Sequence, residues 1–375
     1  MAHQKHAKLS KPLSGKYGRN ELGILGAPCS IIKGLSDLLI QKLSAKYMIA
    51  YVDADHNAPE NDAWSPLESG AYAQYTNKIS FGQLEKIPNA HDSIFFNDAD
   101  LVLINGNHYA AAQQIVYVHP KKSLENKLHK LTNVVGVIVE DEISDLPDYL
   151  KSHLADSTFE TFKSSEVESI ENFIDTWMTS KSPLLKGLVL TGGKSTRMHK
   201  DKSGLSYHGM PQKEYMFNLL EPFCDSVYLS VRNKEQAALE NAPSIEDTFV
   251  GLGPYGGILS AFREDPNAAW LVVAVDLPYL DDETIAQLVK HRNPHKLATC
   301  FIDRNDEYPE PLITIWEPRA YPVLLQFLSQ GYSCPRKVLL NSNTEIIVNR
   351  DKKSLTNVNT PEDHERAYKE LYKNN

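Results

Sequence analysis

The sequence predicts an α/β protein made of two three-layer units, each built on a mostly parallel sheet. Two observations lead to this prediction. Short apolar runs typical of buried strands recur along the chain, and stretches long enough for a helix separate them. Such spacing suits right-handed crossovers between parallel strands. The chain also has 375 residues, which is enough for two or three domains with a full core in each.

The first unit is expected over residues 21–140. Its predicted strands lie at residues 22–26, 48–53, 99–106 and 134–139, and leucines at helical spacing between the first two runs predict a helix. Residues 1–20, which precede this unit, carry five basic side chains and no acidic one. That composition is typical of a solvated, flexible tail.

An acidic stretch follows the first unit and is expected to connect it to the second. Between residues 140 and 175, eleven acidic side chains stand against two lysines. Amphipathic spacing returns at Ile170, Ile174 and Trp177, which predicts a helix at the far end. Residues 141–183 are therefore interpreted as an acidic linker that contains a helix.

The second unit is expected over residues 184–375. Apolar runs at residues 187–191, 226–231, 269–275 and 298–302 predict its strands. Stretches of helix length lie between these runs, so a second α/β unit with a mostly parallel sheet is predicted here.

Composition and charge exclude several classes of function. No apolar run reaches the roughly 18 residues that a membrane span needs, and no apolar segment follows the basic N-terminus as in a secretory signal. Cys29, Cys224, Cys300 and Cys334 lie far apart, without the paired spacing of a metal site. A net charge of -9 gives no general attraction to nucleic acid. We therefore expect a cytoplasmic protein with reduced thiols that binds neither nucleic acid nor a membrane.

The most informative motif follows the first strand predicted in the second unit. Gly192 and Gly193 allow backbone N–H groups to approach a ligand closely, and such groups form a concavity that binds anions. Three cations, Lys194, Arg197 and Lys202, add positive charge for a polyphosphate. The alternative is a solvated basic loop, but the carboxyl end of a strand is where open α/β sheets bind ligands.

The run LTGGKSTRMHKDKS matches neither the P-loop spacing nor the dinucleotide-binding fingerprint. It resembles the motif L-A-G-G-x-S-x-R-M-G-x-D-K of the nucleotidyltransferase family that includes the molybdenum cofactor guanylyltransferases. The resemblance implies a Rossmann-like nucleotidyltransferase fold and a loop from Leu190 that wraps the triphosphate of a nucleotide. It also implies that Lys202 and Arg197 are functional residues. His199 departs from the motif, because the family usually has glycine there.

Two further segments resemble the same family in the expected order. Residues 251–258, GLGPYGGI, are similar to the G-P-x-x-G-I loop of the family, which implies that Gly253 and Gly257 lie near the nucleotide. Taken alone, such a glycine-rich stretch is more often only a turn. Residues 272–279 read as a buried strand that ends in Asp-x-Pro, and the resemblance makes Asp276 the metal-binding aspartate. A carboxylate beside a polyphosphate is a natural Mg²⁺ ligand. An aspartate here can also cap the following helix, although Asp281 or Asp282 would serve that role at least as well.

A fourth segment lies near the end of the chain. Residues 355–363, LTNVNTPED, look like the N-V-N-T-P-E-[ED] ending of the family, whose asparagines are associated with the acceptor. The resemblance assigns that role to Asn357 and Asn359, and Thr360 is expected to cap a last helix that begins at proline. Asn233 stands where the family reads the nucleotide, although the family usually has Asn-Arg there and this chain has Arg-Asn.

Together the four segments imply an enzyme that transfers GMP from GTP to the phosphate of molybdopterin and releases pyrophosphate, with Mg²⁺ as its cofactor. GTP and molybdopterin or the molybdenum cofactor are then the substrates, and a molybdoenzyme client or chaperone would be a further partner. Two alternatives stay open. One is a related nucleotidyltransferase with another nucleotide or acceptor, and the other is a non-catalytic protein that binds and delivers the cofactor.

The first unit resembles a different family, the small GTP-binding P-loop accessory protein of the same pathway. The runs at residues 98–106 and 114–119 carry this resemblance. The phosphate loop is expected at residues 26–33, where Ile31 and Ile32 replace the second glycine and the lysine of the motif. We therefore expect a degenerate P-loop-like fold that neither binds GTP tightly nor hydrolyses it, and that provides a docking surface instead.

Overall fold

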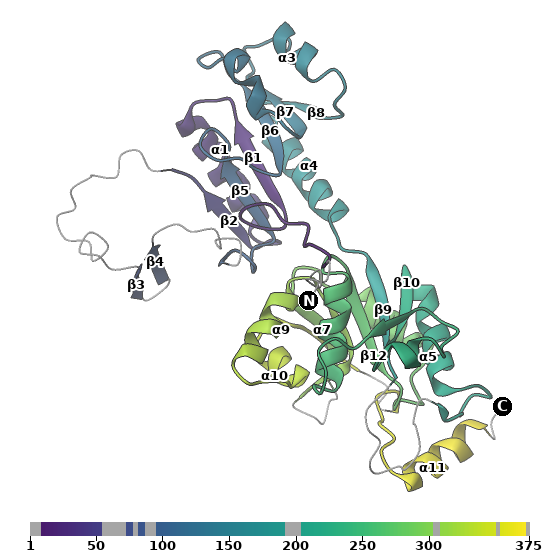
Figure 1. The fold of residues 1–375 in the computed structure, drawn as a ribbon. Helices are drawn as coiled ribbons and strands as arrows, with labels where there is room; N and C mark the ends of the chain where they lie inside the picture. The colour runs from purple at the N-terminus through teal and green to yellow at the C-terminus, as the bar shows by residue number, and fades with distance from the viewer. Residues whose placement is uncertain are drawn as a thin grey trace, which may run out of the picture. The chain divides into compact units, whose positions relative to one another are not determined.

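The computed structural model divides the chain into two compact units, Leu13–Lys181 and Ser182–Asn375, with the residues before Leu13 grouped with the second (Figure 1). It describes residues 9–54, 95–191, 204–302, 308–349 and 353–372, together with the strands at 73–77 and 82–86. No helix among these residues is both long and apolar enough to cross a membrane.

The first unit is built on a six-stranded sheet in which every neighbouring pair is parallel, as predicted. The strand order is β2-β5-β1-β6-β7-β8. The strands are β1 (Glu21–Leu25), β2 (Ile49–Val52), β5 (Leu101–Asn105), β6 (Gln113–Val118), β7 (Val134–Val139) and β8 (Glu160–Lys163). A separate antiparallel pair, β3 (Ala73–Asn77) and β4 (Gly82–Lys86), lies between β2 and β5 in the chain.

Two helices cover one face of this sheet, α1 (Cys29–Leu43) and α4 (Val167–Ser180) (Figure 1). Ile32 and Leu39 of α1 and Ile170 and Ile174 of α4 are fully buried in one apolar cluster with the strands. The opposite face is covered by shorter elements, the 3-10 helix η1 (Glu125–Lys130), α3 (Asp148–His153) and coil. The third layer predicted for this unit is therefore largely irregular.

The structure corrects two of the predicted boundaries. The stretch 141–183 was expected to link the units, but it contains α3, β8 and α4, and β8 pairs with β7 at the edge of the sheet. It therefore completes the first unit. Residues 13–20 were expected to belong to a flexible tail but are part of the first unit, since Tyr17 is 6% exposed and its ring lies 6.0 Å from that of Phe96. An aromatic ring that covers a face of the sheet holds this segment in place.

The second unit is built on a seven-stranded sheet with the order β11-β10-β9-β12-β14-β13-β15. The strands are β9 (Leu185–Leu190), β10 (Ser226–Val231), β11 (Ser244–Glu246), β12 (Ala269–Ala274), β13 (Ala298–Ile302), β14 (Pro309–Trp316) and β15 (Glu345–Val348). All neighbouring pairs are parallel except those of β14, which runs antiparallel to both β12 and β13. The mostly parallel sheet predicted from the sequence is confirmed.

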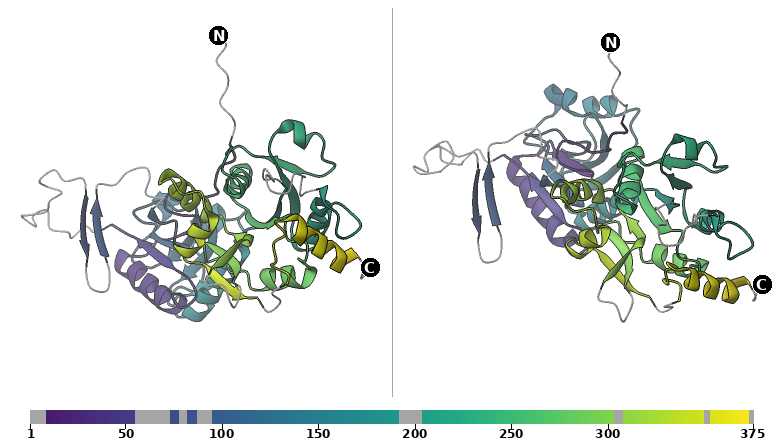
Figure 2. Two further views of the ribbon diagram at one scale, coloured as in Figure 1. Left: turned by 90° about the horizontal axis from the view of Figure 1, so that it is seen from below. Right: turned by 60° about the horizontal axis from the view of Figure 1, so that its bottom comes forward.

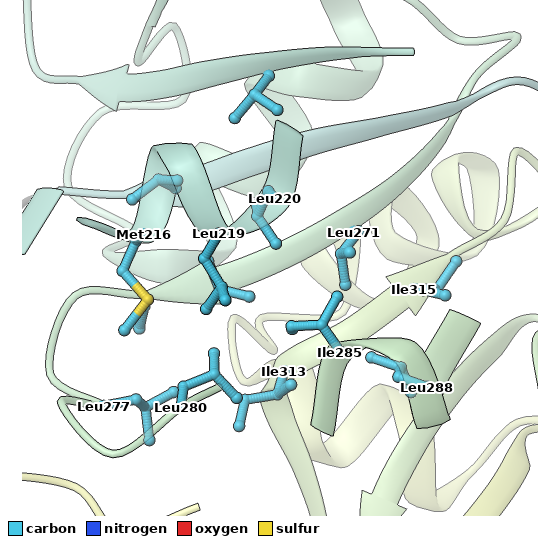
Figure 3. Packing of buried hydrophobic residues seen from close by; sticks show 14 of the residues in the cluster. Met216, Leu219, Leu220, Leu271, Leu277, Leu280, Ile285, Leu288, Ile313 and Ile315 are labelled. Atoms are coloured by element: carbon cyan, nitrogen blue, oxygen red, sulfur yellow. The ribbon is translucent and has the colours of Figure 1, made fainter. Parts of the chain in front are cut away.

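Helices cover both faces of the second sheet, so the predicted three layers are present. On one face, α5 (Gln212–Leu220) and α8 (Asp282–Lys290) pack against the strands, and Figure 3 shows their side chains meeting those of β12 and β14. The other face carries α7 (Pro254–Glu264), α9 (Ala320–Ser329) and α10 (Pro335–Leu340). The remaining helices are η3 (Glu221–Phe223), α6 (Lys234–Ala237) and α11 (Pro361–Tyr372).

A buried ion pair joins α8 to the end of β14. The guanidinium of Arg292 donates two hydrogen bonds to the carboxylate of Glu317, with Nε–Oε1 at 2.7 Å and Nη2–Oε2 at 3.0 Å. The same Nη2 also donates to the carbonyl of Pro183, at the start of the unit. Glu317 is fully buried, so its carboxylate is removed from water and is bound in bidentate geometry by the planar guanidinium of Arg292.

We predict that Arg292→Met lowers the free energy of unfolding by about 3–5 kcal/mol, because it leaves the Glu317 carboxylate buried without a partner. Urea unfolding followed by circular dichroism measures this change. Arg366→Met is the matched control, since its pair with Asp363 lies on the exposed surface of α11, where solvent screens the charges, and its loss should change stability little. Equal losses in the two variants would contradict the structural role of the buried pair.

Candidate active site

The candidate site lies where the parallel strands of the second sheet end. In the register of the sheet, Leu190 at the end of β9 is paired with Ala274 of β12 on one side and with Ser230 of β10 on the other. The segments that follow these strands therefore leave from one edge, the carboxyl edge, where open α/β sheets bind their ligands. Thr191 Oγ1 donates to the carbonyl of Ser230 at 2.5 Å and so fixes the first residue beyond β9.

The glycine- and cation-rich loop begins at this edge. Residues 192–203 lie outside the described residues, and the roles of five predicted site residues in that range stay predictions: Gly192, Gly193, Lys194, Arg197 and Lys202. Leu190, the first residue assigned to the loop, is 8% exposed and packs into the core with Ile258 and Leu259 of α7. The structure therefore describes the strand end from which the loop leaves.

Asp276 lies two residues beyond β12, at the same edge and partly buried. It does not cap the helix that follows. That role belongs to Asp281, whose carboxylate accepts a hydrogen bond from the backbone N–H of Thr284 at 2.9 Å at the start of α8. The capping alternative for Asp276 is thus removed.

The segment near the end of the chain is held against this aspartate. The backbone N–H of Val358 donates to the carbonyl of Asp276 at 2.8 Å. Val358 is buried with Tyr207 and with Ala367 of α11, so the segment is also anchored by apolar packing. Asn357 and Asn359 flank Val358 in the sequence and are exposed. Two segments that resemble one family are therefore in direct contact.

Helix α11 completes this arrangement at the same end of the sheet (Figures 1 and 2). Thr360 caps it as predicted, because its Oγ1 accepts from the N–H of Asp363 at 3.1 Å, and its own N–H donates to the Asp363 carboxylate. Burial, together with the charges of Tyr279 and Asp276, raises the pKa of Tyr207 far above its ordinary value. Tyr207 therefore keeps its proton beside Asp276 at any physiological pH.

The local structure requires glycine at both Gly253 and Gly257, for a different reason at each position. Gly253 begins α7 with φ of 59° and ψ of -138°, a conformation that residues with a side chain rarely adopt. Gly257 lies inside α7, where an added Cβ would come within 2.8 Å of Leu190 Cδ2 and 2.9 Å of Ser230 Oγ. It lets α7 approach the ends of β9 and β10. Whether these glycines also contact a nucleotide stays a prediction.

Asn233 also has a structural role. Its side-chain oxygen accepts a hydrogen bond from the N–H of Gln236 at 2.9 Å and so caps α6 just beyond β10. The residue is exposed at the carboxyl edge, on the side of the sheet where β11 lies. Its predicted role in reading the nucleotide is not tested by this contact.

Asp247 is a candidate that the sequence reasoning missed. It follows β11 directly, and Ser230 Oγ donates to its carboxylate at 3.0 Å. Burial raises the pKa of Asp247, although the Ser230 hydrogen bond and the charge of Arg232 oppose the shift. A carboxylate directly after a strand was the available signal, but β11 has only three residues and was not predicted as a strand.

Comparison with known proteins agrees with this geometry. A family model described as a MobA-like NTP transferase domain matches residues 187–345. A probable molybdenum cofactor guanylyltransferase of Natronomonas pharaonis is 31% identical over 201 residues, which are 49% of this chain and 97% of that protein. The chain belongs to the molybdenum cofactor guanylyltransferase family. The resemblance drawn from the four sequence segments is thereby confirmed.

Two further similarities involve about half of the chain. A molybdenum cofactor biosynthesis bifunctional protein of Synechocystis is 35% identical over 187 residues, or 49% of this chain and 54% of that protein. The chain thus spans about half the length of that relative. A crystal structure of molybdopterin-guanine dinucleotide biosynthesis protein A from Archaeoglobus fulgidus is 26% identical, with a TM-score of 0.44, and covers 50% of this chain and 99% of that one.

In the first unit, a short closed turn lies where the phosphate loop was expected. Only three residues separate β1 from α1, and Asn107 closes this turn by accepting from the N–H of Gly26 and donating to the carbonyl of Ala27. Ile31 and Ile32 do not lie in a loop, as had been expected, but in the first turn of α1, where Ile32 is fully buried. The turn is too short to wrap a phosphate, and Asn107 occupies the N–H of Gly26 and the carbonyl of Ala27.

We predict that the full-length chain binds one molecule of GTP, at the second unit only. Isothermal titration calorimetry with GTP and Mg²⁺ measures the stoichiometry, and Lys202→Ala is expected to weaken the one site because a phosphate-binding cation is lost. Two GTP sites per chain, or one site that Lys202→Ala leaves unchanged, would contradict the assignment.

Proposed function

We propose that this protein transfers GMP from GTP to the phosphate of molybdopterin or the molybdenum cofactor and releases pyrophosphate. The contact between the Asp276 segment and the segment around Val358 carries the proposal. It brings the residue expected to bind the metal and the asparagines expected to bind the acceptor, Asn357 and Asn359, to one edge of one sheet. Membership of the guanylyltransferase family supports the choice of this reaction.

The reaction needs no nucleophile from the protein. An oxygen of the acceptor phosphate attacks the α-phosphorus of the nucleotide, and the bond to the β-phosphate oxygen breaks. The chain has to align these groups and to stabilise negative charge. Lys202 and Arg197 supply fixed positive charge, and the backbone N–H groups at Gly192 and Gly193 supply hydrogen bonds. Gly253 and Gly257 keep α7 close to the nucleotide side of the edge.

Mg²⁺ is the proposed cofactor, and the residues present fit it. Asp276 supplies a partly buried carboxylate at the edge where the triphosphate is expected. No group of three or more His, Cys, Asp or Glu side chains among the described residues has the spacing of a protein-only metal site. Mg²⁺ characteristically binds through one or two carboxylates together with substrate phosphates and water. Bound there, it would neutralise charge on the phosphate oxygens.

The first unit is proposed to act outside the transfer step. Its closed turn gives a physical reason to expect no tight GTP binding. We propose that it provides a docking surface for a molybdoenzyme client or chaperone. The proposal concerns the whole chain, whereas the guanylyltransferase relatives match only about half of it.

The decisive test is pyrophosphate release by the purified chain with each of the four nucleoside triphosphates, with and without molybdopterin. Release that requires both GTP and molybdopterin is the expected result. Release with another triphosphate would identify a related transferase. Tight binding of molybdopterin without any release would favour the delivery protein over the enzyme.

Asp276→Asn is expected to abolish transfer while the fold is retained, because the variant removes the charge of the proposed Mg²⁺ ligand. Lys202→Ala and Arg197→Ala should each lower kcat by about tenfold or more, since negative charge that develops on phosphate loses a fixed cation. Steady-state pyrophosphate release measures these effects. Asp282→Asn, an exposed carboxylate in the first turn of α8, is the matched control and should keep wild-type turnover.

A further inference from the structure

A cysteine, a histidine and an aspartate meet at the carboxyl edge of the first sheet. Cys29 is the first residue of α1, His108 follows β5, and Asp53 follows β2. The Cys29 Sγ atom lies 3.2 Å from His108 Nε2, and the same nitrogen lies 3.9 Å from the Asp53 carboxylate. Strands β2, β5 and β1 are neighbours in that order, so the sheet itself brings these three side chains together.

Two side chains that can donate a hydrogen bond contact this sulfur. Besides His108, the side-chain amide of Asn107 donates to Sγ at 3.6 Å. The sulfur also sits at the N-terminus of a 15-residue helix, which carries a partial positive charge. Surroundings of this kind stabilise a thiolate, which is the nucleophilic form of cysteine. The cluster therefore places a base, His108, and a hydrogen-bond donor, Asn107, within reach of the Cys29 thiol.

The aspartate is arranged to remain charged. Burial acts to raise the pKa of Asp53, but hydrogen bonds from Tyr51 Oη at 2.8 Å and from the N–H of Ala54 at 2.7 Å, together with the charge of His108, lower it below the ordinary value. An aspartate that stays ionised can stabilise the imidazolium formed when His108 takes the proton of the thiol.

The other three cysteines lack this environment. Burial raises the pKa of both Cys224 and Cys300 to about 12, so both remain protonated. Cys334 is exposed at the start of α10, and no histidine side chain in the described part of the chain contacts it. Cys29 is partly exposed and hence accessible to a reagent. The other three cysteines therefore serve as internal controls for the reactivity of Cys29.

The surroundings also indicate the charge of a suitable ligand. Lys122 interacts electrostatically with Cys29, and its ammonium group donates to the carbonyl of Ala27 at 3.2 Å. Burial, together with the charges of Lys127 and Lys130, lowers the pKa of Lys122, although the interaction with Cys29 opposes this shift. Three lysines in one place disfavour a metal cation and favour an anionic ligand, in a chain whose net charge is -9.

We propose that Cys29 and His108 form a thiol–disulfide exchange site that accepts small disulfides carrying carboxylates. His108 takes the proton of the thiol, and the Cys29 thiolate attacks one sulfur of the disulfide. A new S–S bond joins Cys29 to that sulfur as the old S–S bond breaks. The other half leaves as a thiolate and takes the proton back from His108. Cys29 is oxidised to a mixed disulfide, and the leaving thiol is the reduced product.

The experiment is the reaction of the reduced full-length chain with oxidised glutathione, followed by intact mass spectrometry and peptide mapping. One glutathionyl group at Cys29 is expected before any other cysteine reacts. Cys29→Ser should remove this adduct, and Cys334→Ser should leave it unchanged. First modification at Cys334, or equal rates at both cysteines, would overturn the proposal. Neither result depends on guanylyl transfer.

The role of each partner is tested by rates. His108→Gln is expected to slow adduct formation at neutral pH by about tenfold or more and to move the rate profile to higher pH, because the base is lost. Lys122→Met should slow the reaction with oxidised glutathione but not with the uncharged bis(2-hydroxyethyl) disulfide. An unchanged rate and pH profile in His108→Gln would rule out the pair, and equal effects of Lys122→Met on both disulfides would rule out charge selection.

Discussion

The hydrogen bond from the N–H of Val358 to the carbonyl of Asp276 is the contact on which the candidate active site depends. Both groups belong to the backbone, so the contact requires the chain to adopt one conformation at the end of β12 and another in the segment before α11. Burial of Val358 and Tyr207 excludes water from this contact, which makes its loss more costly than that of an exposed hydrogen bond. Thr360 then fixes the direction in which α11 leaves.

In each unit a candidate site lies at the carboxyl edge of the parallel strands, but the side chains at that edge differ. A parallel sheet places the ends of several strands at one edge, and polar side chains that are distant in sequence meet there. In the second unit this edge carries a partly buried aspartate and the start of a cationic loop. In the first unit the corresponding turn is closed by Asn107, and a thiol, an imidazole and a carboxylate meet beside it. The same edge of a parallel sheet thus holds the proposed nucleotide site in one unit and the proposed thiol site in the other.

At both corrected boundaries, a single buried side chain holds a mostly polar segment on the first unit. The acidic stretch 141–183 was interpreted as a linker because its charges outnumber its large apolar residues, yet β8 needs only one buried side chain, Phe162, to join the edge of the sheet. An edge strand keeps one side open to water, so its other residues can be polar. Tyr17 shows the reverse case, in which one aromatic ring is enough to hold a basic segment on the protein.

The sequence alone determined the two α/β units, the family of the second unit and its four signature segments, since each depends on local periodicity or on residues adjacent in the chain. It also identified the first phosphate loop as degenerate, from Ile31 and Ile32. Only the tertiary structure decided that Asp247 lies at the same edge as Asp276 and that Cys29 contacts His108. The order of strands in a sheet sets these contacts, and no local pattern of residues encodes that order.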